Sequence, residues 1–312
     1  MTVKILISYH DNHPILKSDV LTPIQTGCVN APELFDGMLR DDIGNNISDK
    51  NPNYCELTAQ YWAWKNYDKL DNPDYIGFMH YRRQFMFDGW RGNPKCAWQP
   101  NGDVFYVPFI TEGYCRHFAD ETIRSVLKEF DCVAITPYDL TNLKSSSCRE
   151  QYGKLEKQKV ENFDIFIQTA KEIAPDYVKE IEMIENGSVQ YFCNMFVMSR
   201  NLFFRYNEFC FPILFETEKR IQIGDNDRTL GFLGEFLLTA FLFKLQTEQV
   251  WIKELPASYI LSDVVYKYPH LSFFYYWFLS KIAVGERRKR HKTKRKEIKR
   301  ILSVLKNSQA LW

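Results

Sequence analysis

The stretch DYIGFMHYRRQF, residues 74–85, changes from apolar to cationic halfway along. Its first half, 74–80, is the short and nearly continuous apolar run that is typical of a strand buried on both faces. His80, Arg82 and Arg83 stand where that strand should end. The planar fork of arginine binds phosphate oxygens in a bidentate manner, so the pattern favours an anion site at this edge. The alternative is that the arginines pair with acids of the same chain.

Apolar runs of this kind alternate with helical patterns along most of the chain. Strands are expected at 3–8, 74–80, 131–137, 190–199 (with Asn194 in its middle) and 249–255, and helices at 51–70, towards the end of 111–130, and at 160–185, 201–219 and 229–245. This alternation predicts an α/β fold whose largely parallel sheet is covered on both faces. Residues 9–53 are rich in Asn, Asp, Pro and Gly and are expected to be mostly loop. Ligands of such folds bind outside the carboxyl ends of the strands.

Charge divides the chain into two parts. The net charge is only +1, yet residues 271–312 hold 12 Lys and Arg against 2 Asp and Glu, while the other residues hold 28 against 37. A mildly acidic body, 1–255, therefore precedes an aromatic and basic tail, 256–312. At 45% hydrophobic and 25% charged residues, the chain has the composition of a globular protein.

The tail has the features of a segment that lies on a membrane surface. LSFFYYWFLSKIAV (271–284) is apolar but too short to span a bilayer, and GERRKRHKTKRKEIKR (285–300) follows with ten Lys and Arg. Residues 271–300 are therefore predicted to bind an anionic membrane surface. A solvated basic helix is the alternative. Nucleic-acid binding is disfavoured, because the body shows no aromatic platform with interleaved basic residues.

Several well-known functional motifs are absent. The sequence has no P-loop, G-x-G-x-x-G, G-x-S-x-G or H-E-x-x-H pattern, and its eight cysteines form no C-x-x-C pair. The apolar run in MTVKILISYH is too short for a signal peptide. We therefore expect free thiols in a cytoplasmic protein.

Three polar residues in apolar surroundings are candidates for chemistry. Glu235 lies in the otherwise apolar helix at 229–245, where burial would raise its pKa and suit a general base; an ion pair with Arg228 is the alternative. Asn194 needs hydrogen-bond partners, either a sugar hydroxyl or backbone. Glu56 follows Asn53 by three residues, so it is either a ligand contact or part of a capping box.

One Asp-x-Asp pattern occurs, at Asp225-Asn226-Asp227. Two carboxylates at this spacing can bind a divalent metal ion such as Mn²⁺ or Mg²⁺. No long apolar strand precedes them, however, so a turn and helix cap is the favoured interpretation and a metal site the second.

Five stretches in this order carry a resemblance to a known family: DDIGNNIS, NPNYCELTAQYWAWKN, DYIGFMHYRRQF, NMFVM and RTLGFLGEFLLTAF. They are similar to bacterial polysaccharide-synthesis proteins that were long catalogued as a domain of unknown function. Members of that family are regarded as galactofuranosyltransferases of capsule, exopolysaccharide and O-antigen assembly. The resemblance covers roughly residues 3–255.

The resemblance implies a glycosyltransferase of the type A-like fold, a Rossmann-like mixed sheet flanked by helices, with a basic helical C-terminal extension here. It implies a UDP-galactofuranose donor, inversion at the anomeric carbon and a lipid-linked glycan acceptor. The protein would then be peripheral on the inner face of the cell membrane, beside other polysaccharide-assembly enzymes. The alternatives are a different UDP-hexose donor, or a non-catalytic scaffold recruited to the membrane.

Site roles follow from this resemblance. Glu235 would be the base, and Arg82 and Arg83, with His80 nearby, would stabilise the departing diphosphate. Type A enzymes present a metal-binding Asp-x-Asp where this chain has His80-Tyr81-Arg82, so a divalent metal is not supported by a well-placed motif. The remaining donor-binding candidates are Tyr9 and His10, which would contact the nucleotide, and Asp42, Asn46, Glu56 and Asn194.

Overall fold

The computed structural model describes residues 1–11, 13–90, 104–224, 226–262 and 268–309, with backbone alone for 304–309. The chain forms two compact units. The first comprises Met1–Tyr81 with Asp120–Leu255, and the second comprises Arg82–Ala119 with Pro256–Trp312. The chain therefore leaves the first unit immediately after Tyr81, within the stretch that joins the strand to the two arginines. The division into a catalytic domain 1–255 and a membrane-associated tail 256–312 stays a prediction.

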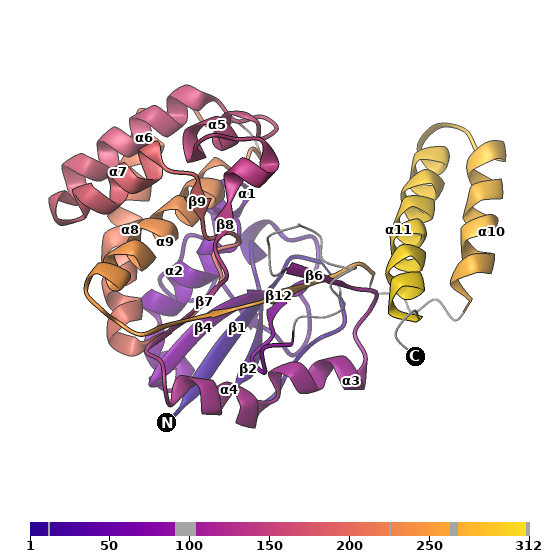
Figure 1. Ribbon diagram of the computed structural model, residues 1–312, viewed down its shortest axis with the longest axis horizontal. Coiled ribbons are helices and arrows are strands. Elements are labelled where there is room, and N and C mark those ends of the chain that lie inside the picture. Colours follow the sequence, from indigo (N-terminus) through magenta and orange to yellow (C-terminus); the bar gives the residue numbers. More distant parts are fainter. Residues whose placement is uncertain (12, 91–103, 225, 263–267, 310–312) are drawn as a thin grey trace. The chain divides into compact units, whose positions relative to one another are not determined.

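A mixed sheet forms the centre of the first unit (Figure 1). Its strands lie in the order β11-β7-β10-β4-β1-β2-β3. Their bounds are β1 Val3–Tyr9, β2 Leu21–Gln25, β3 Leu39–Arg40, β4 Tyr75–His80, β7 Cys132–Ile135, β10 Phe196–Ser199 and β11 Ile252–Leu255. Neighbours are parallel, except that β10 is antiparallel to both β4 and β7. The predicted fold class, a mixed α/β sheet flanked by helices, is confirmed.

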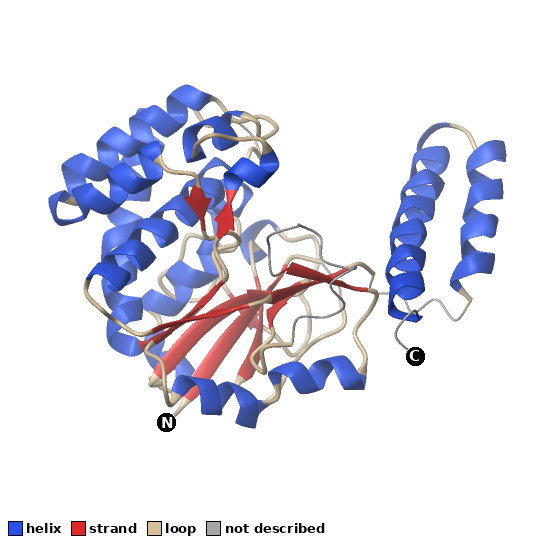
Figure 2. Ribbon diagram, in the orientation of Figure 1, coloured by secondary structure: helices blue, strands red, loops and turns tan. Residues whose placement is uncertain are grey.

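Helices lie on both sides of this sheet (Figure 2). The helices of the first unit are α1 Asn51–Tyr54, α2 Leu57–Lys65, α4 Asp120–Leu127, α5 Cys148–Gly153, α6 Val160–Ile173, α7 Val178–Asn186, α8 Arg200–Arg220 and α9 Thr229–Thr247. α8 packs against β4 and β10, and α6 and α7 form an outer layer on α8 and α9. A short antiparallel ribbon, β8 Tyr138–Asp139 with β9 Val189–Gln190, leads towards β10.

Aromatic side chains fill the space between the sheet and α8. The ring of Phe78 on β4 lies 5.3 Å from that of Phe196 on β10 and 5.9 Å from that of Phe203 on α8, measured between centroids. Offset and edge-on ring pairs of this kind add about 0.5–1.5 kcal/mol each beyond the burial of their area. Aromatic residues make up 16% of the chain, and these rings serve packing.

Helix α9 is apolar on nearly every face because it is a core helix. By length and composition it could cross a membrane, but 78% of its apolar window is buried inside the structure. A buried core helix passes the same test, so the feature is weak support for a membrane span.

Two predicted elements are interrupted at residues with a positive φ angle. The helix expected over 51–70 stops at Tyr54, because Cys55 has φ 52°, and it resumes at Leu57. The strand expected over 190–199 is wrong in its first half: β9 ends at Gln190, and Cys193 and Asn194 have φ 74° and 47° in a turn before β10. Asn194 is therefore a turn residue and not a strand residue.

The interpretation of 9–53 as mostly loop misses two strands. β2 and β3 pair in parallel beside β1, and β2 is buried at Leu21 and Ile24 although Pro23 interrupts its pattern. A proline removes one donor from the ladder, which weakens the sequence signal of a strand without abolishing it. The loop interpretation holds for the residues between these strands.

The second unit is built around β12 Ala257–Ile260, which pairs antiparallel with β5 Arg83–Phe85 and parallel with β6 Val104–Val107. It also contains α3 Glu112–Cys115 and two long helices, α10 Pro269–Ile282 and α11 Gly285–Gln309, which lie side by side. Ile301 of α11 packs with Leu261, next to β12. The predicted helical C-terminal extension is confirmed as this helix pair.

Candidate functional site

The carboxyl end of β4 is tied to the turn that precedes β10. Nε2 of His80 donates a 2.6 Å hydrogen bond to the carbonyl oxygen of Cys193. The backbone N–H of Cys193 in turn donates to Oε1 of Glu235 on α9, at 2.8 Å. Three elements that are distant in sequence thus meet at one residue, and two of the predicted catalytic residues, His80 and Glu235, lie on either side of it.

Glu235 is held through both of its carboxylate oxygens. Besides the Cys193 contact, its Oε2 accepts a 3.2 Å hydrogen bond from the side-chain amide of Gln190. Gln190 is buried, and its Oε1 has no hydrogen-bond partner among the described residues. The result is a fixed, half-buried carboxylate beside an unsatisfied buried acceptor. Buried polar atoms without partners are rare in folded proteins and often face a water or ligand.

Asn194 links the same turn to Glu56. Its Nδ2 donates to Oε1 of Glu56 at 2.8 Å and to the carbonyl oxygen of Gly231 at 3.0 Å. Asn53 lies inside α1 and is not an N-cap, and Glu56, which is the N-cap residue of α2, makes no side-chain capping hydrogen bond there, so the capping-box alternative is wrong. Oδ1 of Asn194 is buried and has no partner among the described residues. The predicted residues Glu56, Asn194 and Glu235 therefore belong to one cluster.

Backbone strain gathers around this cluster. Cys55, Cys193, Asn194 and Arg228 all have φ between 47° and 74°. Non-glycine residues held in this region cost about 1–3 kcal/mol each, and such residues concentrate where a protein binds ligands. The strain is a consequence of bringing the break between α1 and α2, the turn before β10 and the start of α9 to one point.

Two glycines of α9 allow this close approach. A Cβ at Gly234 would lie 2.6 Å from Cδ1 of Leu57 and 3.3 Å from Oδ1 of Asn194. A Cβ at Gly231 would lie 3.0 Å from Sγ of Cys55. The sequence LGFLGEF thus places glycines one and four residues before Glu235, and α9 can pack closely against the turn that holds the Glu235 carboxylate.

Arg228 adds an exposed cation to the cluster. Its Nε donates to Sγ of Cys55 at 3.3 Å. The pKa of Arg228 is raised above its ordinary value. Cys55 makes the largest contribution, and the charges of Glu56 and Glu235 make smaller ones. Burial raises the pKa of the Cys55 thiol to about 12, so Cys55 is uncharged at neutral pH and the two carboxylates are the charges that act on Arg228. The sequence pointed to Arg228 only as a partner of Glu235.

Aromatic rings lie at the carboxyl ends of β1 and β4. The rings of His13 and Tyr81 are stacked at 3.9 Å, and the Tyr81 hydroxyl lies 3.3 Å from Nε2 of His10. Tyr9, by contrast, is fully buried, and its hydroxyl is engaged by the backbone of Pro14 and Leu16. The structure thus places exposed His10 beside a stacked pair that can meet a planar base, whereas Tyr9 supports the loop beneath.

Asp42 and Asn46 hold their own loop. Asp42 forms a forked ion pair with Arg40, with a shortest N···O distance of 2.6 Å, and Nδ2 of Asn46 donates to the carbonyl oxygens of Asp42 and Gly44. Their donor-binding roles stay predictions. The neighbouring Asp41 is fully buried and accepts four hydrogen bonds, from Gly27 N, Cys28 N, Ser48 Oγ and Thr58 Oγ1.

Arg82 and Arg83 belong to the second unit. The carbonyl oxygen of Arg82 accepts from the N–H of Ile260, and the guanidinium of Arg83 lies 5.0 Å from the ring centroid of Tyr259. Both contacts connect the segment after β4 to β12. The role of the two arginines in diphosphate binding stays a prediction.

The Asp-x-Asp stretch lies partly outside the described residues, since Asp225 is not among them. Asp227 is buried, and its two carboxylate oxygens accept from the N–H of Gly224 at 2.6 Å and of Thr229 at 3.0 Å. The Asp227 side chain therefore stabilises the turn that leads into α9. The metal role of the pair stays untested.

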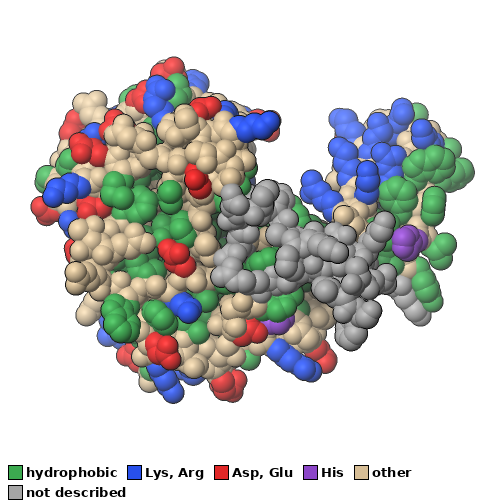
Figure 3. Space-filling model, in the orientation of Figure 1, with side chains coloured by type: hydrophobic (Ala, Val, Ile, Leu, Met, Phe, Trp, Pro, Cys, Tyr) green, Lys and Arg blue, Asp and Glu red, His purple; other side chains and the backbone are tan. Residues whose placement is uncertain are grey.

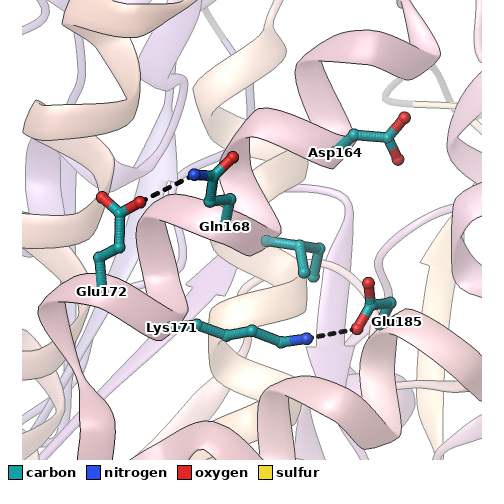
Figure 4. Close-up of a pocket in the computed structure, with 6 residues that line it drawn as sticks. Asp164, Gln168, Lys171, Glu172 and Glu185 are labelled. Atoms are coloured by element: carbon teal, nitrogen blue, oxygen red, sulfur yellow. Dashed lines mark hydrogen bonds and ion pairs between the residues drawn. The ribbon is translucent and has the colours of Figure 1, made fainter.

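A separate hollow of about 360 Å³ lies between α6 and α7 (Figure 4). Its polar groups satisfy one another: Lys171 pairs with Glu185 at 2.6 Å, and Gln168 donates to Glu172 at 2.9 Å. No residue of the Glu235 cluster lines it. We therefore assign the candidate site to the cluster at the strand ends.

Fold and cluster together define an α/β protein whose polar candidate site lies at the carboxyl edge of its central sheet. The family model described as "Domain of unknown function (DUF4422)" matches residues 4–247, and the chain belongs to that family. The apo structure of WbbM, a bifunctional glycosyltransferase, is similar to this chain at 31% identity with a TM-score of 0.74. That match covers 83% of this chain and 45% of WbbM, so the chain spans less than half of that protein. Among curated proteins, none matches.

The cysteines of the described residues are all free thiols, and Cys96 lies outside that part of the chain. The expectation of free thiols thus holds for seven of the eight cysteines.

Proposed function

We propose that the protein is an inverting glycosyltransferase that moves galactofuranose from UDP-galactofuranose to a hydroxyl of a lipid-linked oligosaccharide. The product would belong to capsule, exopolysaccharide or O-antigen biosynthesis. The observation that carries the proposal is the Glu235 carboxylate, fixed at the sheet edge by Cys193 and Gln190. The similarity to the glycosyltransferase WbbM supports the reaction class. The donor sugar rests on the resemblance of the sequence motifs.

In the proposed reaction Glu235 is the general base. A carboxylate is a proton acceptor, so Glu235 would take the proton of the acceptor hydroxyl. The acceptor oxygen forms a bond to the anomeric carbon while the bond from that carbon to the phosphate oxygen breaks, and UDP leaves with the electron pair. Attack opposite to the leaving group inverts the anomeric configuration. The hydrogen bonds from Cys193 and Gln190 orient the base before the substrate arrives.

Donor binding would use the groups around Glu235. Oδ1 of Asn194 and Oε1 of Gln190 are buried acceptors suited to sugar hydroxyls. The stacked His13 and Tyr81 rings, with His10, would meet the uracil. The exposed Arg228 would offset the charge that develops on the diphosphate, and the resemblance of the sequence motifs gives the same role to Arg82 and Arg83. Should a divalent metal take part, Asp225 and Asp227 are the candidate ligands.

The test is a donor panel. The protein is incubated with UDP-galactofuranose, UDP-galactopyranose or UDP-glucose and a lipid-like acceptor, with and without EDTA, and both UDP and the glycoside are measured. We expect a β-linked galactofuranoside. Transfer from another UDP-hexose alone would replace the donor, and neither transfer nor donor hydrolysis would favour the membrane-recruited scaffold. Full activity in excess EDTA would discard Asp225 and Asp227 as a metal site.

Arg82→Ala tests the diphosphate role separately. We expect loss of turnover with an unchanged fold, because an uncompensated diphosphate is a poor leaving group. Arg149→Ala is the matched control, since Arg149 pairs with Asp164 on the surface and lies in α5. Near-normal activity of Arg82→Ala would refute the proposed role of that arginine.

A further inference from the structure

Helix α10 presents an apolar stripe to solvent. Leu271, Phe274, Tyr275, Phe278 and Ile282 are between 57% and 67% exposed. Their spacing of three and four residues places them on one face of the helix. Scattered exposed apolar residues are normal in soluble proteins, but a continuous stripe of large side chains marks a surface that another phase or molecule covers.

The opposite face of α10 is already used. Ser280 is the buried residue of the helix, and the ring of Tyr276 lies 6.0 Å from that of His291 on α11. α10 and α11 pack along each other, so the helix pair is complete without the stripe. An amphipathic helix in a soluble bundle would turn its most apolar face towards its partner. Here the most apolar face points away from it.

α11 supplies a dense positive charge beside this stripe. It contains eleven Lys and Arg against two Glu, and these glutamates pair within the helix, Glu286 with Lys289 and Glu297 with Lys294. Figure 3 shows Lys and Arg side chains gathered over α11 and hydrophobic ones over α10. Ile298 and Ile301 are fully buried, and Ile301 packs with Leu261, so α11 is attached to the part of the second unit that contains β12.

We propose that the α10–α11 pair docks on the surface of an anionic lipid bilayer, with the α10 stripe inserted at the level of the headgroups. At 14 residues, α10 is too short to cross a bilayer and has the length of an interfacial helix. Trp277 and Tyr275 have the amphipathic rings that settle at a membrane interface. Lys281, whose Nζ lies 5.8 Å from the Trp277 ring, can extend to the headgroups while its stem stays in apolar surroundings.

The positive charge of α11 and the apolar stripe of α10 together favour a bilayer over other partners. A second copy of this chain would bring two strongly basic helices together, and each would repel the other. A nucleic acid would attract α11 but would leave the apolar stripe of α10 in water. An anionic bilayer meets both features at once, since its headgroups attract the lysines and arginines and its acyl region covers the stripe. The inference does not depend on the proposed transfer reaction.

Vesicle flotation of the full-length chain tests the proposal. We expect the protein to float with phosphatidylcholine vesicles that contain phosphatidylglycerol, to stay behind with phosphatidylcholine alone, and to be released in part by high salt. Phe274→Ser with Phe278→Ser should reduce the bound fraction at least tenfold, because two large side chains no longer leave water. Trp251→Ser is the matched control: Trp251 is 69% exposed but lies in the first unit, so binding should not change.

Three results would overturn the proposal. The first is equal binding to neutral and anionic vesicles, and the second is binding of the double variant at the level of the unchanged protein. The third is a dimer in solution that the double variant no longer forms, with no vesicle binding by either the unchanged protein or the double variant. That result would assign the stripe to contact with a second copy of the chain. Since all three substituted positions, Phe274, Phe278 and Trp251, are exposed, circular dichroism should show that each variant is folded.

Discussion

Asn194 and Glu56 are joined by a 2.8 Å hydrogen bond between residues that are 138 positions apart in the chain. The amide of Asn194 also donates to the carbonyl oxygen of Gly231, so both of its hydrogens are used. One side chain therefore joins the start of α2, the turn before β10 and the first turn of α9. This arrangement fixes the turn whose backbone holds Glu235.

Asn194→Asp should strongly reduce turnover. The substitution replaces a donor by a second carboxylate beside Glu56, and like charges at hydrogen-bond distance repel. We expect at least a tenfold loss in kcat, together with a loss of about 1–3 kcal/mol in the free energy of unfolding. Steady-state kinetics and urea unfolding measure the two effects.

Asn194→Gly separates the side chain from the backbone conformation. Glycine adopts φ 47° without strain, so this variant should be more stable than Asn194→Asp and still be impaired in activity. Gln249→Gly is the control, because Gln249 also has positive φ but lies at an exposed turn away from the cluster. Full activity of Asn194→Gly would assign Asn194 a backbone role alone.

Gly234→Ala should destabilise the protein although alanine is the better helix former. The added methyl would lie 2.6 Å from Cδ1 of Leu57, and overpacking of this kind costs about 1–3 kcal/mol, against a propensity gain of about 1 kcal/mol. We expect a net loss of stability by urea unfolding. Gly153→Ala is the matched control, since its Cβ would meet nothing closer than 3.7 Å. Equal effects of the two substitutions would contradict the close packing of α9.

The apolar runs at the sheet centre were sufficient to predict strands β1, β4, β7 and β11 and the α/β class. Such strands are buried on both faces and carry a strong continuous signal. β2 was missed because Pro23 and short apolar stretches weaken that signal. The break at Cys55 and the turn at Cys193 were missed for a different reason. Local propensity does not indicate positive φ at cysteine, and only contacts from α9 and β4 impose it.

Candidate residues were easier to predict than their partners. Glu235, Glu56 and Asn194 stood out as polar residues in apolar surroundings, and the structure brings them into one cluster. Gln190 and the backbone of Cys193 gave no such signal, because a glutamine at a strand end is ordinary and a backbone N–H leaves no trace in a sequence. Nothing in the sequence distinguishes Asp41 from Asp42 as the buried residue, although it is Asp41 that is fully buried.

Stability should fall as the pH rises above about 9. Burial raises the pKa of Cys55, Cys148 and Cys210 from 9.0 to about 12. These thiols stay protonated in the folded state when they would ionise in the unfolded chain, so their contribution is present below pH 9 and is lost as the pH rises towards 12. Each thiol can cost about 1.4 kcal/mol per pH unit in that window.

Urea unfolding under reducing conditions between pH 7.5 and 10.5 measures this dependence. We expect a plateau followed by a decline, with a shallower decline for Cys210→Ala, which removes one of the titrating groups. A free energy of unfolding that stays constant to pH 10.5 would contradict the burial of these thiols.

Glu235 is the central residue of the proposed reaction, as its general base. Glu235→Gln keeps the size of the side chain but cannot accept the acceptor proton, so kcat for transfer from UDP-galactofuranose should fall by about 10²–10⁴ with little change in donor KM. Glu248→Gln is the control, since Glu248 follows α9 directly and pairs with Arg205 at the surface. Single-turnover transfer by the two variants is the decisive measurement. Loss in Glu235→Gln alone is the predicted result, and normal transfer by that variant would contradict the proposed site.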